Sequence, residues 1–210
     1  MLLALFALLL KTPPAGPPAA YVTFSPLTKA AYLEANKGAI VTKLVMTFPL
    51  KKARGRIVIP TTKGPKVFQD KGVGTDNDDQ AQFEYLGYAA GFKCHLINGS
   101  YWEGGEYLLV SDSGQQLAFP SLPQYSPDMR HLVVFSAGIE VGFMPNVIQL
   151  YRIEKGRWQQ VWKLEPTVDP ASWEPAEIHW LNNKALLLRK RMWAGENPGS
   201  TFTYAKLTIR

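Results

Sequence analysis

The sequence predicts an all-β fold built from consecutive antiparallel hairpins, a meander, with one short helix near its beginning. Aromatic residues make up 12% of the chain, and aromatic and β-branched residues favour strands. The 16 Pro and 17 Gly divide the chain into many short segments, as in all-β proteins. Several neighbouring segments are joined by residues that suit tight hairpin turns.

Length and composition indicate one domain with a hydrophobic core. The chain has 210 residues, of which 46% are hydrophobic and 19% charged. A chain of this composition can bury a core and is not intrinsically disordered. We expect residues 1–20 to form a signal peptide or a tail, and residues 21–210 to form a single β-rich domain.

An apolar run near the beginning predicts export. Residues 2–10 form an unbroken apolar stretch, too short to cross a bilayer as a helix but typical of the core of a signal peptide. Four prolines and then Ala19-Ala20, small residues suited to cleavage, follow it. No Lys or Arg precedes the run, so a tail is the alternative. We expect a secreted or periplasmic protein without a transmembrane anchor in its mature chain.

The charge and the single cysteine exclude several functions. The net charge is +6, but only residues 51–54 and 189–191 form tight basic groups, so we expect a solvated surface and no nucleic-acid partner.

Cys94 is the only cysteine, which excludes an intrachain disulfide and a multi-cysteine zinc site. Cys94 and His95 lie in a predicted strand and point to opposite faces, so a buried structural thiol is expected rather than a nucleophile with its base.

The helix is predicted shortly after residue 25. Thr28 or Ser25 can cap it, residues 30–35 suit two or three turns, and Gly38 ends it. Residues 40–48 are apolar and β-branched, which predicts a strand or a buried helix.

Turn residues mark the strands that follow. Residues 56–59 and 66–69 flank a turn-rich link and predict a hairpin. Asp112-Ser113-Gly114 and Asn182-Asn183 are the other clear hairpin signals, because these residue types tolerate positive φ. The further predicted strands are residues 83–88, 92–97, 106–111, 115–119, 131–136, 147–153, 158–164, 178–181, 184–190 and 201–209.

Two segments of the second half resemble each other. Tyr125-Ser126-Pro127-Asp128 precedes one apolar strand, and Trp180-Leu181-Asn182-Asn183 precedes another. Residues 117–190 thereby resemble the blades of β-propellers of the TolB and WD40 type, in which a Ser-Pro-Asp turn often introduces a blade. The resemblance implies propeller-like blades; a β-sandwich or a meander without a ring is the alternative. This part is also similar to exported bacterial proteins, a likeness that implies no function.

An acidic loop is the candidate metal site. Asp76, Asp78 and Asp79, with Asn77 and Gln80, place several oxygen ligands in one segment, and calcium prefers such ligands. The EF-hand spacing is not matched, and a solvated loop is the alternative. Calcium is the only cofactor that the sequence suggests.

An aromatic cluster is the candidate ligand site. Tyr101, Trp102, Glu103 and Tyr107 surround a Gly-Gly pair, and aromatic faces beside carboxylates can stack on a sugar or a peptide. Packing between sheets is the alternative for these rings.

These observations favour binding over catalysis. The chain has no serine-hydrolase elbow and no phosphate-binding glycine motif, and no catalytic residues are predicted. We expect a non-enzymatic binding or scaffold module of the bacterial cell envelope, with a protein, peptide or glycan as its partner. The alternatives are an envelope-polymer hydrolase that uses Glu103 or the acidic loop, and a toxin-binding immunity-type protein.

Overall fold

The computed structural model of this chain describes residues 21–75, 78–138, 144–154, 156–166, 172–192 and 201–210. These residues contain 15 strands and one α-helix, so the predicted all-β class with one short helix is confirmed. The predicted signal peptide or tail, residues 1–20, and Asp76 of the acidic loop lie outside the described residues.

Three antiparallel meanders and one hairpin form the molecule. The hairpin pairs β3 (Arg56–Ile59) with β4 (Lys66–Gln69), as predicted. The strands of the first sheet, in spatial order, are β2 (Met46–Thr47), β5 (Ala81–Ala89), β6 (Cys94–Tyr101), β7 (Gly104–Ser111) and β8 (Gln116–Phe119). A 3-10 turn, Ala90–Phe92, joins β5 to β6.

The second and third sheets repeat the meander. The second sheet contains β9 (Gln124–Tyr125), β10 (His131–Ser136), β11 (Val147–Glu154) and β12 (Arg157–Leu164). The third contains β13 (Trp173–Asn182), β14 (Ala185–Met192), β15 (Phe202–Ile209) and β1 (Val22–Leu27). The first strand of the described chain, β1, thus pairs with the last, β15.

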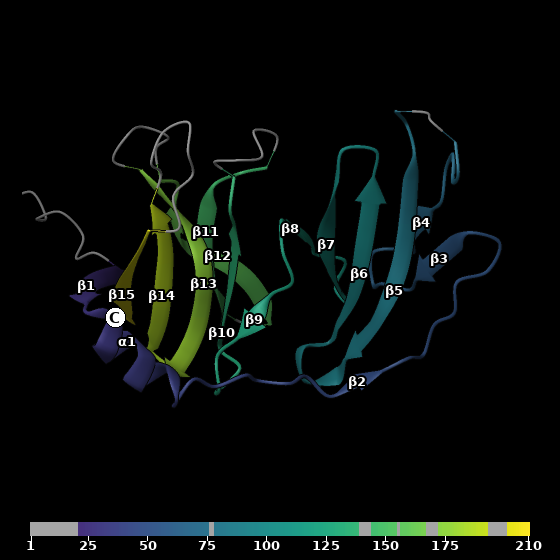
Figure 1. Cartoon of the computed structure of the whole chain (residues 1–210). Helices are drawn as coiled ribbons and strands as arrows, with labels where there is room; N and C mark the ends of the chain where they lie inside the picture. Colours follow the sequence, from purple (N-terminus) through teal and green to yellow (C-terminus); the bar gives the residue numbers. More distant parts are fainter. Residues whose placement is uncertain (1–20, 76–77, 139–143, 155, 167–171, 193–200) are drawn as a thin grey trace, which may run out of the picture.

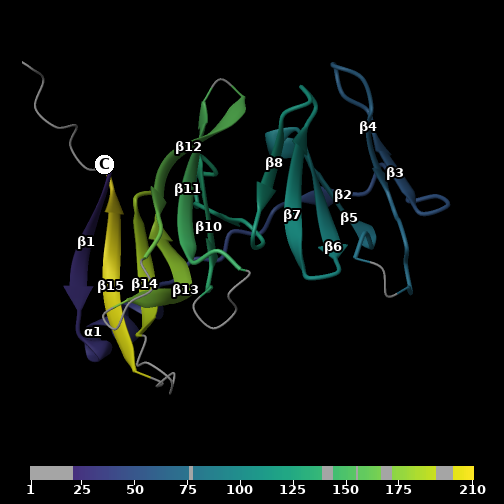
Figure 2. The same cartoon turned by 90° about the horizontal axis from the view of Figure 1, so that it is seen from above.

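The hairpin and the three sheets are stacked in a row (Figures 1 and 2). One hydrophobic cluster fills each space between neighbours. The cluster between hairpin and first sheet includes Ile57 and Ile97, and the cluster between first and second sheets includes Phe119 and Leu132. The cluster between second and third sheets is centred on Trp180. Each sheet therefore buries apolar side chains against the next, and none closes into a barrel.

The two similar segments of the sequence lie next to each other. The backbone N–H of Asp128, in the turn before β10, donates to Asn183 Oδ1, in the turn before β14, at 2.9 Å. The indole of Trp180 donates to the carbonyl oxygen of Gln124 at 3.1 Å. Hydrogen bonds thus connect corresponding segments of the second and third sheets. The resemblance to propeller blades stays a prediction.

The single helix, α1 (Lys29–Asn36), begins as predicted. The Thr28 hydroxyl accepts a hydrogen bond from the N–H of Ala31 at 3.2 Å, the usual arrangement of an N-cap. Ser25, the alternative cap, lies instead in β1, which the sequence did not indicate as a strand. Pro26 is tolerated there because β1 is an edge strand.

Among the described residues, no helix has the length and apolarity that a membrane crossing requires.

Residues 39–52, which we call the strap, link the third sheet to the first along one side of the molecule (Figure 1). The prediction of a strand or buried helix over residues 40–48 is wrong for most of this segment. Only Met46–Thr47 pair with β5, and Ile40 makes a single bridge to Trp180. The strap crosses the second sheet without joining it, so its β-branched residues have no neighbouring strand to pair with.

Candidate functional site

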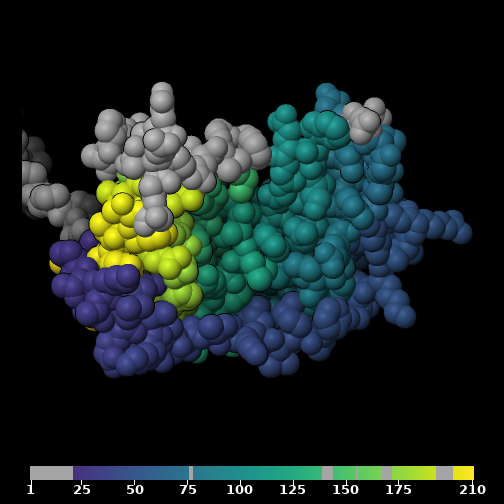
Figure 3. Space-filling view, in the orientation of Figure 1, coloured from purple at the N-terminus to yellow at the C-terminus, as the bar shows by residue number. Residues whose placement is uncertain are grey.

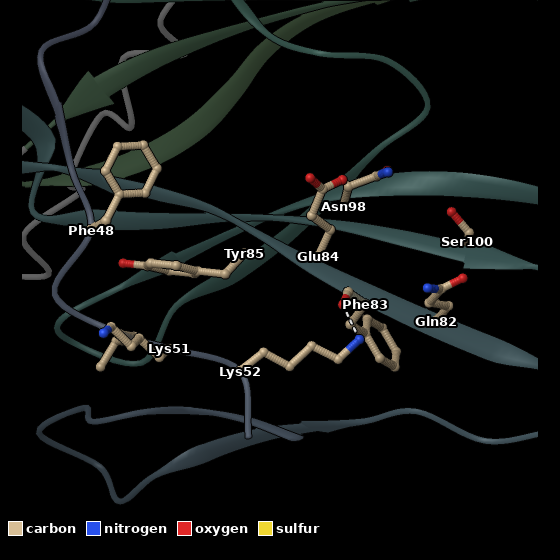
Figure 4. A pocket seen from close by; sticks show the side chains of 10 residues that line it. Phe48, Lys51, Lys52, Gln82, Phe83, Glu84, Tyr85, Asn98 and Ser100 are labelled. Atoms are coloured by element: carbon tan, nitrogen blue, oxygen red, sulfur yellow. Dashed lines mark hydrogen bonds between the residues drawn. The ribbon is translucent and has the colours of Figure 1, made fainter. Parts of the chain in front are cut away.

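A hollow of about 640 Å³ lies where the strap passes the outer strand of the first sheet (Figure 4). We call it the edge pocket. Its lining residues are Phe48, Leu50, Lys51 and Lys52 of the strap, Gln82, Phe83, Glu84 and Tyr85 of β5, and Asn98 and Ser100 of β6.

Four polar side chains form one wall of the edge pocket. Glu84 lies opposite Asn98, and Gln82 lies opposite Ser100, in the register of β5 and β6. Alternate residues of a strand share a face, so all four side chains lie on the same face of the sheet. Within the described chain, none of these side chains is hydrogen-bonded to another protein group. This polar tetrad therefore has its donors and acceptors available to a ligand.

Two aromatic residues also line the edge pocket, Phe48 of the strap and Tyr85 of β5, but Tyr85 follows Glu84 and lies on the opposite face of the sheet, against the hairpin side. Phe48 extends from the strap with 67% of its surface exposed. Tyr85 is partly buried, and its hydroxyl and His95 Nδ1 are hydrogen-bonded at 2.9 Å. Burial raises the pKa of Tyr85 to about 12, so the phenol stays neutral. The pocket thus combines exposed aromatic surface with free hydrogen-bonding groups.

An ion pair covers the backbone edge of β5 beside the pocket. The N–H of Phe83 donates to Asp70 Oδ1 at 2.9 Å, and Lys52 Nζ donates to the carbonyl oxygen of Phe83 at 2.8 Å. Lys52 and Asp70 also pair with each other at 2.5 Å. Burial opposes ionisation of Asp70, but the hydrogen bonds from Lys52 and Phe83 outweigh it and lower the pKa of Asp70. At Phe83, therefore, no backbone group is left for an added strand.

Behind Tyr85 lies a polar network around the buried side chain of His95. His95 is 5% exposed, and its Nε2 is 4.0 Å from Asp112 Oδ1. The hydroxyl of Tyr88 donates to Asp112 Oδ2 at 2.9 Å. Burial lowers the pKa of His95, although Asp112 opposes this. His95 is thus a hydrogen-bonded core histidine.

The network predicts loss of stability in mild acid. An unfolded histidine has a pKa of about 6.5, whereas that of folded His95 is lower. The unfolded state therefore binds more protons below about pH 6.5, and the free energy of unfolding falls there by up to ~1.4 kcal/mol per pH unit. Urea unfolding at several pH values from 7.5 to 5 measures this slope.

His95→Gln is expected to reduce the slope without abolishing it, because burial also lowers the pKa of His131. Equal slopes in the variant and the natural protein would contradict a neutral His95 in the fold.

A second hollow, of about 480 Å³, brings together parts of the two sites predicted from the sequence. Asp78 and Asp79 of the acidic loop and Tyr101 of β6 all line it. The ring of Phe83 is 5.4 Å from that of Phe68 and 6.1 Å from that of Tyr101. Phe83 also lines the edge pocket, so the two hollows adjoin along β5.

The other predicted ligand residues are dispersed. Trp102 and Glu103 form the turn between β6 and β7, where Trp102 is 50% exposed. The hydroxyl of Tyr101 donates to Glu106 at 2.6 Å. Tyr107 lies opposite Asn98 and packs against the cluster between the first and second sheets. Tyr101 and Tyr107 thus occupy opposite faces of the sheet.

The described residues include no group of three or more His, Cys, Asp and Glu side chains that could hold a metal ion. Asp78 and Asp79 are exposed, and Asp76 lies outside the described residues, so calcium binding by this loop stays a prediction.

The thiol of Cys94 is buried, as predicted. Its sulfur donates to the carbonyl oxygen of Phe92 at 3.2 Å. Burial raises the pKa of this thiol to about 12. Since the thiolate is the reactive form of cysteine, Cys94 is a structural residue.

The sequence reasoning did not select the polar tetrad. The only available signal was the spacing of Gln82 with Glu84 and of Asn98 with Ser100, each pair two residues apart, and of the four only Glu84 lies within a predicted strand, residues 83–88. Comparisons of the chain with protein-family models, with curated proteins and with solved structures found no match.

Proposed function

We propose that the protein is a non-enzymatic module of the bacterial cell envelope that binds a glycan in the edge pocket. The observation that carries the proposal is the polar tetrad, whose four side chains have no hydrogen-bonded partner within the described residues and line a hollow that Phe48 also lines. Sugars need this combination, because their hydroxyl groups require donors and acceptors while their apolar faces stack on aromatic rings.

The edge of β5 favours a glycan over an extended peptide. A peptide that adds to a sheet binds through backbone hydrogen bonds along a free edge. At Phe83 those groups are already bonded to Asp70 and Lys52. At this position of the edge pocket recognition is left to side chains, which suits a ligand read through its hydroxyl and amide groups.

The carboxylates support binding rather than hydrolysis. Glycosidases generally use two carboxyl groups, about 5–9.5 Å apart. Glu84 is the only carboxylate among the described residues that line the edge pocket. Glu103, the residue expected for a hydrolase, lies in the exposed turn after β6 and does not line this hollow.

Titration calorimetry with a panel of N-acetylglucosamine oligomers, glucans and mannans tests the proposal. We expect one class to bind, and Asn98→Ala and Phe48→Ala each to weaken its binding about tenfold, since a hydrogen bond or an aromatic contact contributes about 1–1.5 kcal/mol. Gln116→Ala is the matched control, because Gln116 is an exposed polar residue on β8 of the same sheet.

Two results would contradict the proposal. One is the absence of binding across the panel by the folded protein, and the other is binding that neither pocket variant weakens. Release of new reducing ends that Glu84→Gln abolishes would assign hydrolysis to the pocket instead.

A further inference from the structure

The positive charge of the chain is concentrated in one stretch. Residues 35–69 contain eight Lys and Arg and no Asp or Glu. The whole chain has 23 basic and 17 acidic residues, which leaves 15 basic and 17 acidic residues outside this stretch. The net charge of +6 therefore belongs entirely to residues 35–69, which include the strap.

The strap also exposes apolar side chains. Val41 is 76% exposed and Val45 is 80% exposed. Leu44, which precedes Val45, and Met46, which follows it, instead pack against the hydrophobic cluster between the first and second sheets. The strap is thus extended, and its alternate residues turn Val41, Lys43 and Val45 outward. Isolated exposed apolar residues are common, but two valines of this exposure on either side of a lysine form a continuous amphipathic surface.

The cations of the strap remain available. Lys43 and Lys51 are exposed, and within the described chain neither forms an ion pair or a hydrogen bond. Lys52, in contrast, is bound to Asp70. Lys43 and Lys51 therefore carry unpaired charges next to the exposed apolar residues of the strap.

The strap lies along the outside of the molecule. In Figure 3 it continues from α1 as a ridge that runs along the lower side of the stacked sheets, in purple to blue. Two further exposed apolar side chains belong to this part of the chain, Leu33 of α1 at 52% and Phe48 of the strap at 67%. A long ridge of this kind can contact a flat surface along its length.

We propose that the strap docks the protein on an anionic lipid bilayer. Exposed apolar side chains beside lysines are the signature of interfacial membrane binding, because the apolar groups enter the headgroup region while the cations attract anionic lipids. A bilayer fits better than a protein because the surface is a convex ridge of one charge sign. Val41, Lys43 and Val45 do not line the edge pocket, whereas Lys51 and Phe48 line it as well, so the Val41 and Val45 variant is the one that separates this inference from the glycan proposal.

Co-sedimentation of the full chain with lipid vesicles tests the inference. We expect binding to vesicles of phosphatidylcholine mixed with phosphatidylglycerol, much weaker binding to phosphatidylcholine alone, and a decrease with added salt. Lys43→Gln with Lys51→Gln is expected to lower the partition coefficient about 25-fold, since each lysine near an anionic surface contributes about fivefold. Val41→Ser with Val45→Ser is expected to lower it at least tenfold.

Matched controls carry the same changes elsewhere on the surface. Lys71→Gln removes an exposed lysine that bridges to Ala81, the first residue of β5. The strap pairs with the other end of β5, at Ala89, so Lys71 lies away from the strap. Leu122→Ser removes an exposed apolar side chain between β8 and β9. Both controls are expected to bind vesicles like the natural protein.

Several results would overturn the inference: no binding to anionic vesicles, equal binding to neutral ones, strap variants that bind normally, or controls that lose binding equally. Retention of a protein partner by the strap, without vesicle binding, would also overturn it. The Val41 and Val45 variant should keep any glycan affinity, so failure here is distinguishable from failure of the glycan proposal.

Discussion

Replacing Trp180 by alanine is expected to lower the free energy of unfolding by about 3–5 kcal/mol. Trp180 is 1% exposed and is among the largest fully buried side chains. Its ring fills the space between the second and third sheets, and its indole N–H bonds to Gln124 across that space. The substitution removes the contact area and the hydrogen bond together and leaves a cavity between two sheets.

Thermal and urea unfolding measure this effect, and for a domain of this size we expect the melting temperature to fall by roughly 10 °C. Trp180→Phe should restore most of the lost stability, because it keeps a ring and loses only the bond to Gln124. Trp102→Ala is the matched control, since Trp102 is half exposed in a turn. Equal losses in Trp180→Ala and Trp102→Ala would contradict the buried role of Trp180.

Gly87→Ala is expected to destabilise the protein by about 2–4 kcal/mol and to push the strap away from β5. Gly87 lies at a bulge in the register of β5 with β6 and has a φ of 122°, which strains any other residue. A Cβ atom there would lie 3.1 Å from the Thr47 carbonyl oxygen and 3.2 Å from the ring of Phe48. Overcrowding and backbone strain therefore act together.

Gly91→Ala provides the comparison, because a Cβ at Gly91 would meet nothing within 4 Å. Unfolding experiments should show a large loss for Gly87→Ala and little change for Gly91→Ala. Hydrogen exchange should show faster exchange of the amides of Met46 and Thr47 in Gly87→Ala alone. Normal stability of Gly87→Ala would mean that the strap is not held against β5 in solution.

The hairpins were predictable because their determinants are local. The strands flanking residues 61–65 and the strand at residues 131–136 have the predicted bounds, since turn residues mark their ends. Long-range pairings were not predictable in this way. The first strand, β1, forms by pairing with β15 at the other end of the described chain. No turn next to β1 in the sequence indicates this pairing.

The strap was misread for a related physical reason. β-Branched residues favour a strand only where a neighbouring strand is present, and most of the strap has none. Its alternation of apolar residues between core and solvent also resembles neither a buried strand nor a buried helix. Hydrophobicity alone therefore does not distinguish a structural segment from an exposed apolar surface.

The candidate site was predictable only in part. The sequence indicated the acidic loop and the aromatic cluster as two separate candidate sites, and in the structure Asp78 and Asp79 of the first and Tyr101 of the second line one hollow. The separation of Tyr101 from Tyr107 follows from the alternation of side chains along paired strands. The polar tetrad depends on the register of β5 and β6, in which Glu84 lies opposite Asn98, and register is a property of two strands together.

The pairing of β1 with β15 has a consequence for the order of assembly. Val22 and Ile209, which are partners in this pair, are 187 residues apart. During synthesis from the amino end, β1 and α1 are made long before their partner strand exists, while the successive hairpins that follow can form as they are made. Bringing such distant segments together costs loop-closure entropy that local hairpins do not pay. Completion of the third sheet is therefore expected to be the last step of folding, and until then the strap is anchored at one end only.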